Sequence, residues 1–282
     1  MKLEPKFVEK PWGRTGLAAV PPALRGCRIG EIWFEAARGK RLPLLVKHIV
    51  ADAFLSVQVH PDDEQARARG LPGGKSECWY ILDALPKATI ALGPKRELSQ
   101  DRLRAAALDG SIEGLLHWHP VRAGDFFYVP AGTIHAIGPG ISLIEVQQPS
   151  DVTYRLFDYG RPRELHLAEA LEVAIRTPYP RELIKRADPN RGTLFVGGPQ
   201  FAMVAAAGRR GAGALAERDR FAFVLEGTAA AGGDVGRAGD CLFVPRGAKL
   251  ECSKDASLLI AAEGAWTATE AAPPVPERRR AA

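Results

Sequence analysis

Short runs of strand-forming residues, some with alternating apolar and polar positions, end at turns containing glycine or proline along most of this chain. This pattern is typical of β-strands. In residues 54–60, a period of two places Gln58 and His60 on one face of the expected strand. The other strands expected in the first part of the chain are residues 31–35, 42–50, 75–83, 88–92, 126–129, 141–147 and 152–159. Later strands are expected at residues 194–196, 201–205, 221–225, 241–244 and 257–261.

The apolar spacing changes to a helical period in two places. Ser99 can cap a helix whose apolar residues recur three to four positions apart, and a second short helix follows. Residues 95–118 are therefore predicted to be a helical insertion in a β domain. The same spacing predicts a helix over residues 165–176. Residues 1–30 contain several breakers, among them Pro21 and Pro22, and are expected to be irregular.

One turn framework occurs twice. In residues 124–135, G-D-F-F-Y-V-P-A-G-T-I-H, a strand ends at Pro130 and a second turn at Gly132 precedes His135. Residues 239–250 repeat the framework G-D-x4-P-x-G, with Leu250 in the place of the histidine. Residues 222–227 also match residues 79–84. These two segments are farther apart in the sequence than the two turn frameworks are, and the extra separation is close to the length of the helical insertion. We infer an internal duplication, although ordinary turn chemistry could repeat the framework by chance.

The predicted architecture is a mainly β protein with two small barrels. The first domain covers residues 1–162 and carries the helical insertion, and residues 163–193 form a helical linker. The second barrel covers residues 194–266 and is expected to hold no metal, because Leu250 replaces the histidine and the strand match puts Arg220 at the position of Glu77. Residues 267–282 are expected to be a disordered, solvated tail.

Composition narrows the classes of function. The chain is 46% apolar and 25% charged, as expected of a globular protein, and no apolar run approaches the roughly 20 residues that span a bilayer. The net charge is +5, and a run of three arginines, residues 278–280, falls in the expected tail; no basic face with interleaved aromatic residues indicates a nucleic-acid partner. The four cysteines are far apart, without a C-x-x-C pair, so we expect a protein of the reducing cytoplasm.

Four polar residues near strand ends are candidate metal ligands: Gln58, His60, Glu77 and His135. Two imidazoles, a carboxylate and an amide oxygen suit zinc, with iron, manganese or cobalt as substitutes. A lone histidine is more often structural than a ligand, and this alternative is kept for the remaining histidines: His48, His117, His119 and His166. His117 and His119 also form an H-x-H pair at the end of the insertion, which is a weaker candidate for a metal site.

The turn motif before His135 is similar to the second motif of the cupin superfamily, and four segments carry a closer resemblance. They are L-S-V-Q-V-H-P-D-D at 55–63, G-K-S-E-C-W-Y-I-L at 74–82, V-P-A-G-T-I-H-A-I at 129–137 and Q-Q-P-S-D-V-T-Y-R-L-F-D-Y at 147–159. They resemble the corresponding segments of type I mannose-6-phosphate isomerases, in the short bacterial and archaeal branch. The resemblance implies two cupin-type (jelly-roll) barrels and a zinc-dependent aldose-ketose isomerase that interconverts mannose 6-phosphate and fructose 6-phosphate through a cis-enediol.

The resemblance also implies roles for single residues. The zinc ligands, one zinc per chain, would be His60, Glu77 and His135, with Gln58 as a ligand in some members of the family. Arg155 matches the family's active-site arginine, and Arg161 lies where a basic residue is expected near the phosphate. The other pocket residues that match are Lys75, Glu145 and Asp151. Two departures are Phe157, where the family often has tyrosine, and residues 34–37.

These residue types suit an isomerisation. Moving a carbonyl from C1 to C2 requires a proton to leave C2 and return to C1, and the developing negative charge needs a cation beside it, which zinc and Arg155 can supply. Glu145 is a candidate base, and Lys75 could assist ring opening or hold an oxygen. The alternatives are a non-enzymatic sugar-phosphate-binding cupin and a metal-dependent cupin dioxygenase. Basic residues in the expected pocket favour a phosphorylated small molecule, with the protein a monomer or homodimer and no membrane or nucleic-acid partner.

Overall fold

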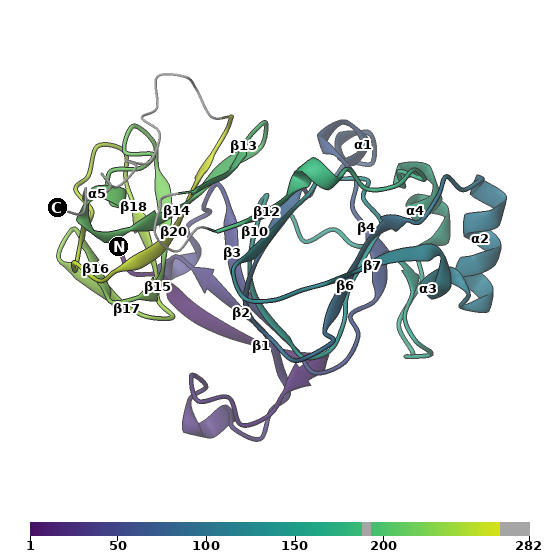
Figure 1. Cartoon of the computed structure of the whole chain (residues 1–282), viewed down its shortest axis with the longest axis horizontal. Helices are drawn as coiled ribbons and strands as arrows, with labels where there is room; N and C mark the ends of the chain where they lie inside the picture. Colours follow the sequence, from purple (N-terminus) through teal and green to yellow (C-terminus); the bar gives the residue numbers. More distant parts are fainter. Residues whose placement is uncertain (188–192, 266–282) are drawn as a thin grey trace, which may run out of the picture. The chain divides into compact units, whose positions relative to one another are not determined.

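The computed structural model describes residues 1–187 and 193–265 and is mainly β, with antiparallel strand pairing in several sheets (Figure 1). This confirms the predicted fold class. Two compact units are present. One contains Lys6–Trp33 and Lys47–Ile184, and the other contains Met1–Pro5, Phe34–Val46 and the described residues from Lys185 onward. The second unit thus takes two N-terminal segments that the sequence placed in the first domain, and the expected tail at 267–282 lies outside the described residues.

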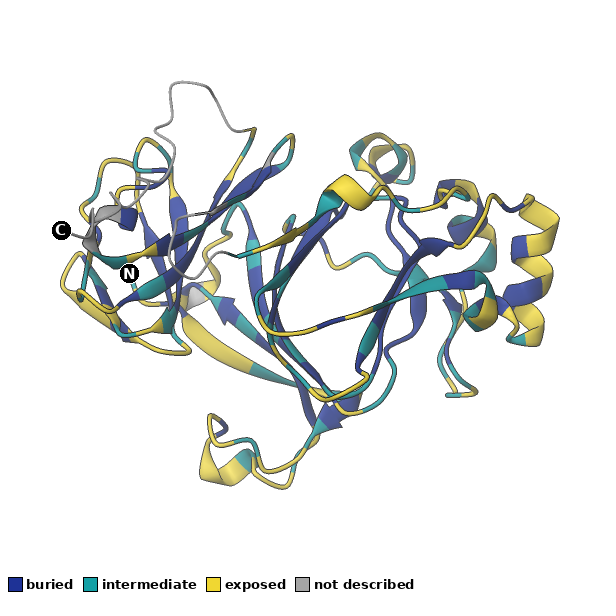
Figure 2. Ribbon diagram, in the orientation of Figure 1, coloured by how far each residue is buried: buried dark blue, intermediate teal, exposed yellow. Residues whose placement is uncertain are grey.

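Two sheets build the first unit. The seven-stranded sheet has the order β1 (Glu4–Arg14), β2 (Ile29–Glu35), β3 (Leu45–Ala51), β10 (Ile141–Gln147), β5 (Glu77–Ala84), β8 (Asp125–Val129) and β12 (Ile184–Arg186). The five-stranded sheet has the order β11 (Tyr154–Phe157), β4 (Val57–Val59), β9 (His135–Ile137), β6 (Thr89–Pro94) and β7 (Leu116–Pro120). Buried residues of both sheets share one apolar cluster, among them Trp79 and Phe127 from the first and Ile90 and Ile137 from the second. The core therefore lies between the sheets (Figure 2).

Helices cover the opposite face of the five-stranded sheet. They are α2 (Gln100–Asp109), α3 (Ile112–Leu115) and α4 (Leu167–Val173), whereas the short helix α1 (Asp63–Ala68) follows β4 in the chain. Ser99 caps α2 as predicted, because its hydroxyl accepts a hydrogen bond from the backbone N–H of Arg102 at 3.1 Å. Buried residues of α2 and α4 pack with Val57 and Val59 of β4 in a second apolar cluster. None of the helices within residues 1–187 and 193–265 is long and apolar enough to cross a membrane.

Three expectations about local structure need correction. Residues 1–30 are not irregular throughout, since β1 contains Pro5 and Pro11. Because β1 is the edge strand of its sheet, these prolines need not donate to a neighbouring strand. The helical insertion ends at α3, and residues 116–118 belong to β7. Finally, the expected helical linker at 163–193 contains, in its described part, α4 but also a short 3-10 segment and the edge strand β12.

The second unit contains a smaller pair of sheets. Its five-stranded sheet has the order β13 (Thr193–Gly197), β14 (Phe201–Ala207), β20 (Ser257–Glu263), β15 (Arg220–Glu226) and β18 (Cys241–Val244). Its three-stranded sheet has the order β17 (Asp234–Arg237), β16 (Thr228–Ala231) and β19 (Glu251–Cys252). A short helix, α5 (Gly208–Gly211), follows β14. Apolar residues of both sheets are buried together, including Val204, Leu242 and Ile260.

The strand registers of the two units support the inferred duplication. In the first unit Glu77 lies opposite Val129 on β8 and opposite Gln147 on β10. In the second unit Arg220 lies opposite Val244 on β18 and Ala262 on β20. The partners of Arg220 are the residues that match the partners of Glu77, so Arg220 occupies in the second unit the register position that Glu77 occupies in the first.

The three-stranded sheet of the second unit is the counterpart of β7, β6 and β9, because β16 pairs with β17 and β19 as β6 pairs with β7 and β9. In the five-stranded sheet, β4 and β11 follow β9, whereas the three-stranded sheet ends at β19. Within the described residues, the three-stranded sheet therefore has no counterparts of β4 and β11. In the first unit, β4 carries Gln58 and precedes His60, and β11 carries Arg155.

The insertion is expected to contribute to stability through one face of α2. Leu103 is fully buried, whereas Leu108 on the same helix is 66% exposed. Leu103→Ala should lower the free energy of unfolding by about 2–5 kcal/mol, because it removes buried methyl groups and leaves a cavity. Leu108→Ala should change it by less than about 0.5 kcal/mol. Urea unfolding of the two variants measures the difference, and equal effects would contradict this packing of α2.

Candidate active site

Three buried side chains that could hold a metal converge between the two sheets of the first unit: His60, Glu77 and His135. Glu77 begins β5 in the seven-stranded sheet, His135 begins β9 in the other sheet, and His60 follows β4. The Nε2 atom of His135 lies 3.3 Å from Glu77 Oε1, and that of His60 lies 3.5 Å from Glu77 Oε2. The potential ligand atoms all lie within 4.8 Å of one another. The structure thus brings together three of the four predicted ligands.

Backbone carbonyls orient both imidazoles. His60 Nδ1 donates a hydrogen bond to the carbonyl of Val152 at 2.7 Å, and His135 Nδ1 donates to the carbonyl of Thr133 at 2.9 Å. A carbonyl only accepts, so the proton of each neutral ring is on Nδ1 and the lone pair is on Nε2. The two lone pairs therefore lie on the side of Glu77, as in metal sites whose histidines are fixed by outer hydrogen bonds.

The buried polar atoms at this point fit a metal ion. Neither carboxylate oxygen of Glu77 nor Nε2 of His60 has a hydrogen-bond partner of good geometry. Lys75 Nζ lies 3.1 Å from Glu77 Oε2 and forms an ion pair with it. A buried carboxylate left without hydrogen bonds is costly, and a divalent cation would supply the missing partner. Two imidazoles and one carboxylate with an open fourth position form the donor set of catalytic zinc sites.

Burial keeps both histidines in the form that binds metals. Burial lowers the pKa of His60 well below its usual value, and the charge of Lys75 lowers it further. Burial also lowers the pKa of His135, to about 4, although its hydrogen bond to Thr133 acts in the opposite direction. Both rings are therefore neutral near pH 7, so a metal ion does not have to compete with protons for them.

Gln58 lies beside this cluster, but its amide nitrogen faces His135, whereas the sequence predicts the amide oxygen as a metal ligand. Its Nε2 is 3.2 Å from His135 Nε2, and its Oε1 accepts a hydrogen bond from Ser56 Oγ at 3.1 Å. The amide nitrogen, which cannot bind a cation, therefore faces the ligands. Its oxygen would face them only if the amide were turned over, a change that leaves the shape of the side chain almost unaltered. Gln58 as a fourth ligand stays a prediction.

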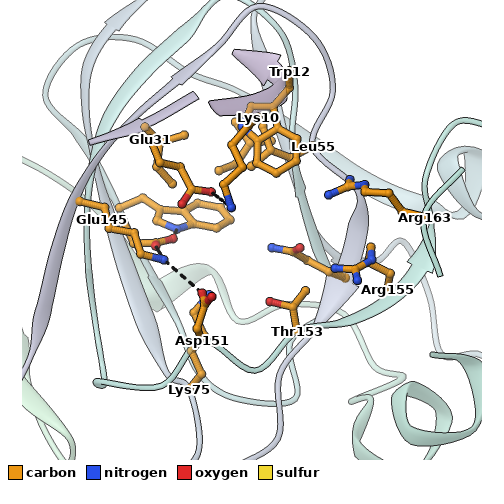
Figure 3. Close-up of a pocket in the computed structure, with 15 residues that line it drawn as sticks. Lys10, Trp12, Glu31, Leu55, Lys75, Glu145, Asp151, Thr153, Arg155 and Arg163 are labelled. Atoms are coloured by element: carbon orange, nitrogen blue, oxygen red, sulfur yellow. Dashed lines mark hydrogen bonds and ion pairs between the residues drawn. The ribbon is translucent and has the colours of Figure 1, made fainter. Parts of the chain in front are cut away.

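A polar pocket adjoins the cluster, and the structure brings together most of the predicted site residues there (Figure 3). The predicted residues that line it are Gln58, Lys75, Glu145, Asp151 and Arg155. Arg161 is not among the lining residues, whereas Arg163 is. Arg161 instead donates to Asp158 Oδ1 at 2.7 Å and to the carbonyl of Phe54 at 2.8 Å.

Glu145 and Lys75 form one wall of this pocket with a residue that sequence reasoning missed. Lys47 is 3% exposed, and its Nζ lies 3.3 Å from Glu145 Oε1. Glu145 Oε2 accepts a hydrogen bond from Trp79 Nε1 at 3.1 Å. Burial by itself would lower the pKa of Lys75, but Glu77, Glu145 and Asp151 together raise it above its usual value. Lys75 is therefore a stable cation and a hydrogen-bond donor. The signal for Lys47 was a lysine, next to His48, within the mostly apolar run of residues 42–50.

A second carboxylate lines the same wall and was also missed. Glu31 Oε2 accepts a hydrogen bond from Trp33 Nε1 at 2.6 Å, and Glu31 Oε1 lies 3.2 Å from Lys10 Nζ. The weaker metal candidates, His117 and His119, lie on β7 with stacked rings whose centroids are 4.1 Å apart. Of the groups of three or more potential ligands in residues 1–187 and 193–265, the His60 cluster is the one found.

The neutral histidines predict a pH dependence of stability. Unfolded His135 takes up a proton near its usual pKa of 6.5, whereas folded His135 does so only near 4. The contribution of this pKa difference to the free energy of unfolding is therefore complete above about pH 6.5 and is lost as the pH falls toward 4. Urea unfolding of metal-stripped protein between pH 7 and pH 4.5 should show a smaller loss of stability for His135→Gln than for the wild type. His48, whose pKa burial also lowers to about 4, acts equally in both proteins. Parallel pH profiles would contradict the expectation.

Comparison with known proteins finds related sequences. A scan against models of protein families finds no match. Mannose-6-phosphate isomerase ManA of Bacillus subtilis is 39% identical to this chain over 209 residues, which are 60% of this chain and 66% of that protein. Probable mannose-6-phosphate isomerase GmuF of the same organism is 36% identical over 211 residues, 61% of this chain and 67% of the relative. The matches thus span about two thirds of the length of these relatives.

The fold agrees as well. The crystal structure of the mannose 6-phosphate isomerase from Bacillus subtilis superimposes with a TM-score of 0.77 at 27% identity, covering 92% of this chain and 98% of that one. The similarity of fold therefore covers a larger part of the chain than the similarity of sequence. Together, the relatives show that this chain belongs to the mannose-6-phosphate isomerase family.

Proposed function

We propose that this protein interconverts mannose 6-phosphate and fructose 6-phosphate. The observation that carries the proposal is the buried His60, Glu77 and His135 cluster beside a pocket with both acidic and basic walls. The names of the relatives and of the similar solved structure support the same activity. A site that only binds a sugar phosphate has no need of a buried metal-binding cluster next to a pocket carboxylate and a protonated lysine.

The proposed resident metal is zinc, one per chain, held by His60, Glu77 and His135. When bound, zinc would supply a Lewis acid beside the substrate oxygens at C1 and C2. The neutral imidazoles and the carboxylate would leave one net positive charge on the bound ion and its ligands. The identity of the metal rests on the donor set, since mixed nitrogen and oxygen ligands suit zinc well.

The chain's own residues divide the proton transfers between them. Glu145 would take the proton from C2 and return it to C1, because it is a pocket carboxylate held in place by Lys47 and the N–H of Trp79. Lys75, protonated beside Glu77, would donate a hydrogen bond to the oxygen that gains negative charge. Arg155 would stabilise the enediolate from the neighbouring strand, since its backbone pairs with that of Gln58.

Removal of the metal tests the role of the cluster. A chelator should abolish the conversion of mannose 6-phosphate to fructose 6-phosphate in a coupled assay, and added zinc should restore it. Elemental analysis should find one metal per chain in the wild type and none in His135→Ala. The second unit offers Leu250 and Arg220 at the corresponding positions, and neither side chain can bind a cation. Full activity in metal-free protein, or a tightly bound metal that survives in His135→Ala, would contradict this assignment.

Substitution of Arg155 tests the proposed stabilisation of charge. Arg155→Ala should lower kcat by about 10²–10³, which corresponds to roughly 2.7–4 kcal/mol of transition-state stabilisation. Metal content and thermal stability should stay close to those of the wild type, because Arg155 is only partly buried. Arg104→Ala, an exposed position on α2, is the matched control and should leave kcat unchanged. A near-wild-type rate in metal-loaded Arg155→Ala would remove Arg155 from the chemistry.

A further inference from the structure

Two arginines form the wall of the pocket opposite Glu31 and Glu145: Arg155 and Arg163 (Figure 3). The protein holds only part of each guanidinium. Arg155 Nε donates to the carbonyl of Glu164 at 3.0 Å. Arg163 donates from Nε to Asp158 Oδ2 and from Nη2 to Asp158 Oδ1, both at 2.6 Å. In the described part of the chain, Nη1 of Arg163 and both terminal nitrogens of Arg155 have no recorded partner, so each arginine keeps donors for a ligand.

The charges behind this wall do not balance. Asp158 is 2% exposed and pairs with both Arg161 and Arg163. Arg155 adds a third cation, and its pKa is lowered by burial first and then by the charge of Arg163. Asp158 and the exposed Glu164 act on Arg155 in the opposite direction. One buried carboxylate therefore serves three guanidinium groups, and an anion in the pocket would relieve their mutual repulsion.

Among the described residues, Arg161 and Arg163 both leave Nη1 without a hydrogen bond, but only Arg163 lines the pocket. Arg161 uses Nε and Nη2 for Asp158 and the carbonyl of Phe54, and its guanidinium lies 5.7 Å from the ring of Tyr159. Arg163 lies 5.0 Å from the ring centroid of Trp12, which also lines the pocket. Asp158 on one side and the indole on the other thus hold the guanidinium of Arg163 at the pocket wall.

We propose that Arg163, held in place by Asp158, binds the phosphate group of the substrate and selects phosphorylated sugars, with Asp158 as a positioning residue. This inference rests on the proposed isomerase function. A guanidinium already fixed by a carboxylate loses little conformational freedom on binding, and its outward N–H groups match the geometry of phosphate oxygens. Arg161, at the position that the family resemblance associates with the phosphate, takes a structural role in this chain. The phosphate end of the sugar would then lie against Arg163, and its reacting end beside Glu145, with Arg155 assigned to the reacting end.

Kinetics with two substrates test the proposal. Arg163→Met should raise the KM for mannose 6-phosphate roughly 10- to 100-fold with little change in kcat, as expected when a charge-assisted hydrogen bond made equally in ground and transition states is lost. The inhibition constant of inorganic phosphate should rise by a similar factor. The kcat/KM for unphosphorylated mannose should not fall, because that sugar has no group for Arg163 to bind.

Further variants separate the positioning role from a general loss of structure. Arg163→Lys keeps the charge but loses the fork to Asp158, so its KM should lie between those of the wild type and Arg163→Met. Asp158→Asn should raise the KM and the phosphate inhibition constant together. Arg122→Met removes an arginine whose side chain is 75% exposed and should change neither constant. If Arg163→Met does not fold, Arg163→Lys and Asp158→Asn carry the test.

The outcomes also separate this proposal from the proposed function. If the metal-loaded wild type does not isomerise mannose 6-phosphate, the isomerase assignment fails. If the wild type is active but folded Arg163→Met keeps its KM and phosphate inhibition constant within twofold, Arg163 does not bind the phosphate. A loss of phosphate affinity in Arg161→Met alone would return that role to Arg161.

Discussion

The burial of Glu77 between two sheets is the constraint on which the site depends. Its carboxylate is fully buried, and neither oxygen accepts a hydrogen bond of good geometry. The nearest histidines are held neutral by burial, so they bring lone pairs but no positive charge. Lys75 supplies one charge on one side. On the side of the two imidazoles, the negative charge of Glu77 has no positive partner. A divalent cation would be stabilised most strongly at that position.

The second unit also buries a charged side chain at this register position, but the residue is different. At the register position of Glu77 it has Arg220, a guanidinium that is 1% exposed and donates to the carbonyls of Leu215 and Ala248. A buried side chain that carries its own positive charge repels a metal cation at ligand distance. The strand framework is thus kept in both units, whereas among the described residues a cluster that could hold a metal is found in the first unit alone. The registers of β15 with β18 and β20 preserve this relation, although the residues that fill the positions have changed.

The two walls of the pocket differ in charge, because the carboxylates of one wall are paired and the guanidinium groups of the other are only partly paired. On one wall, Glu31 and Glu145 each accept a hydrogen bond from a tryptophan N–H and pair with a lysine. On the opposite wall, Arg155 and Arg163 face the pocket with unused donors (Figure 3). Balanced carboxylates suit hydroxyl groups and proton transfer, whereas unbalanced guanidinium groups suit an anion. A pocket with this polarity would orient a molecule that carries a negative charge at one end.

The sequence by itself determined most strands and indicated the three residues that could hold a metal, because alternation, turn residues and the motif that ends at His135 are local signals. Tertiary structure decided what depends on neighbours distant in the chain. Residues 4–14 form a strand despite their prolines because β1 lies at a sheet edge. Lys47 belongs to the pocket because β3 pairs with β10, which carries Glu145. Arg161 and Arg163 lie two residues apart on one loop, and only the way that loop folds around Asp158 decides which guanidinium faces the pocket.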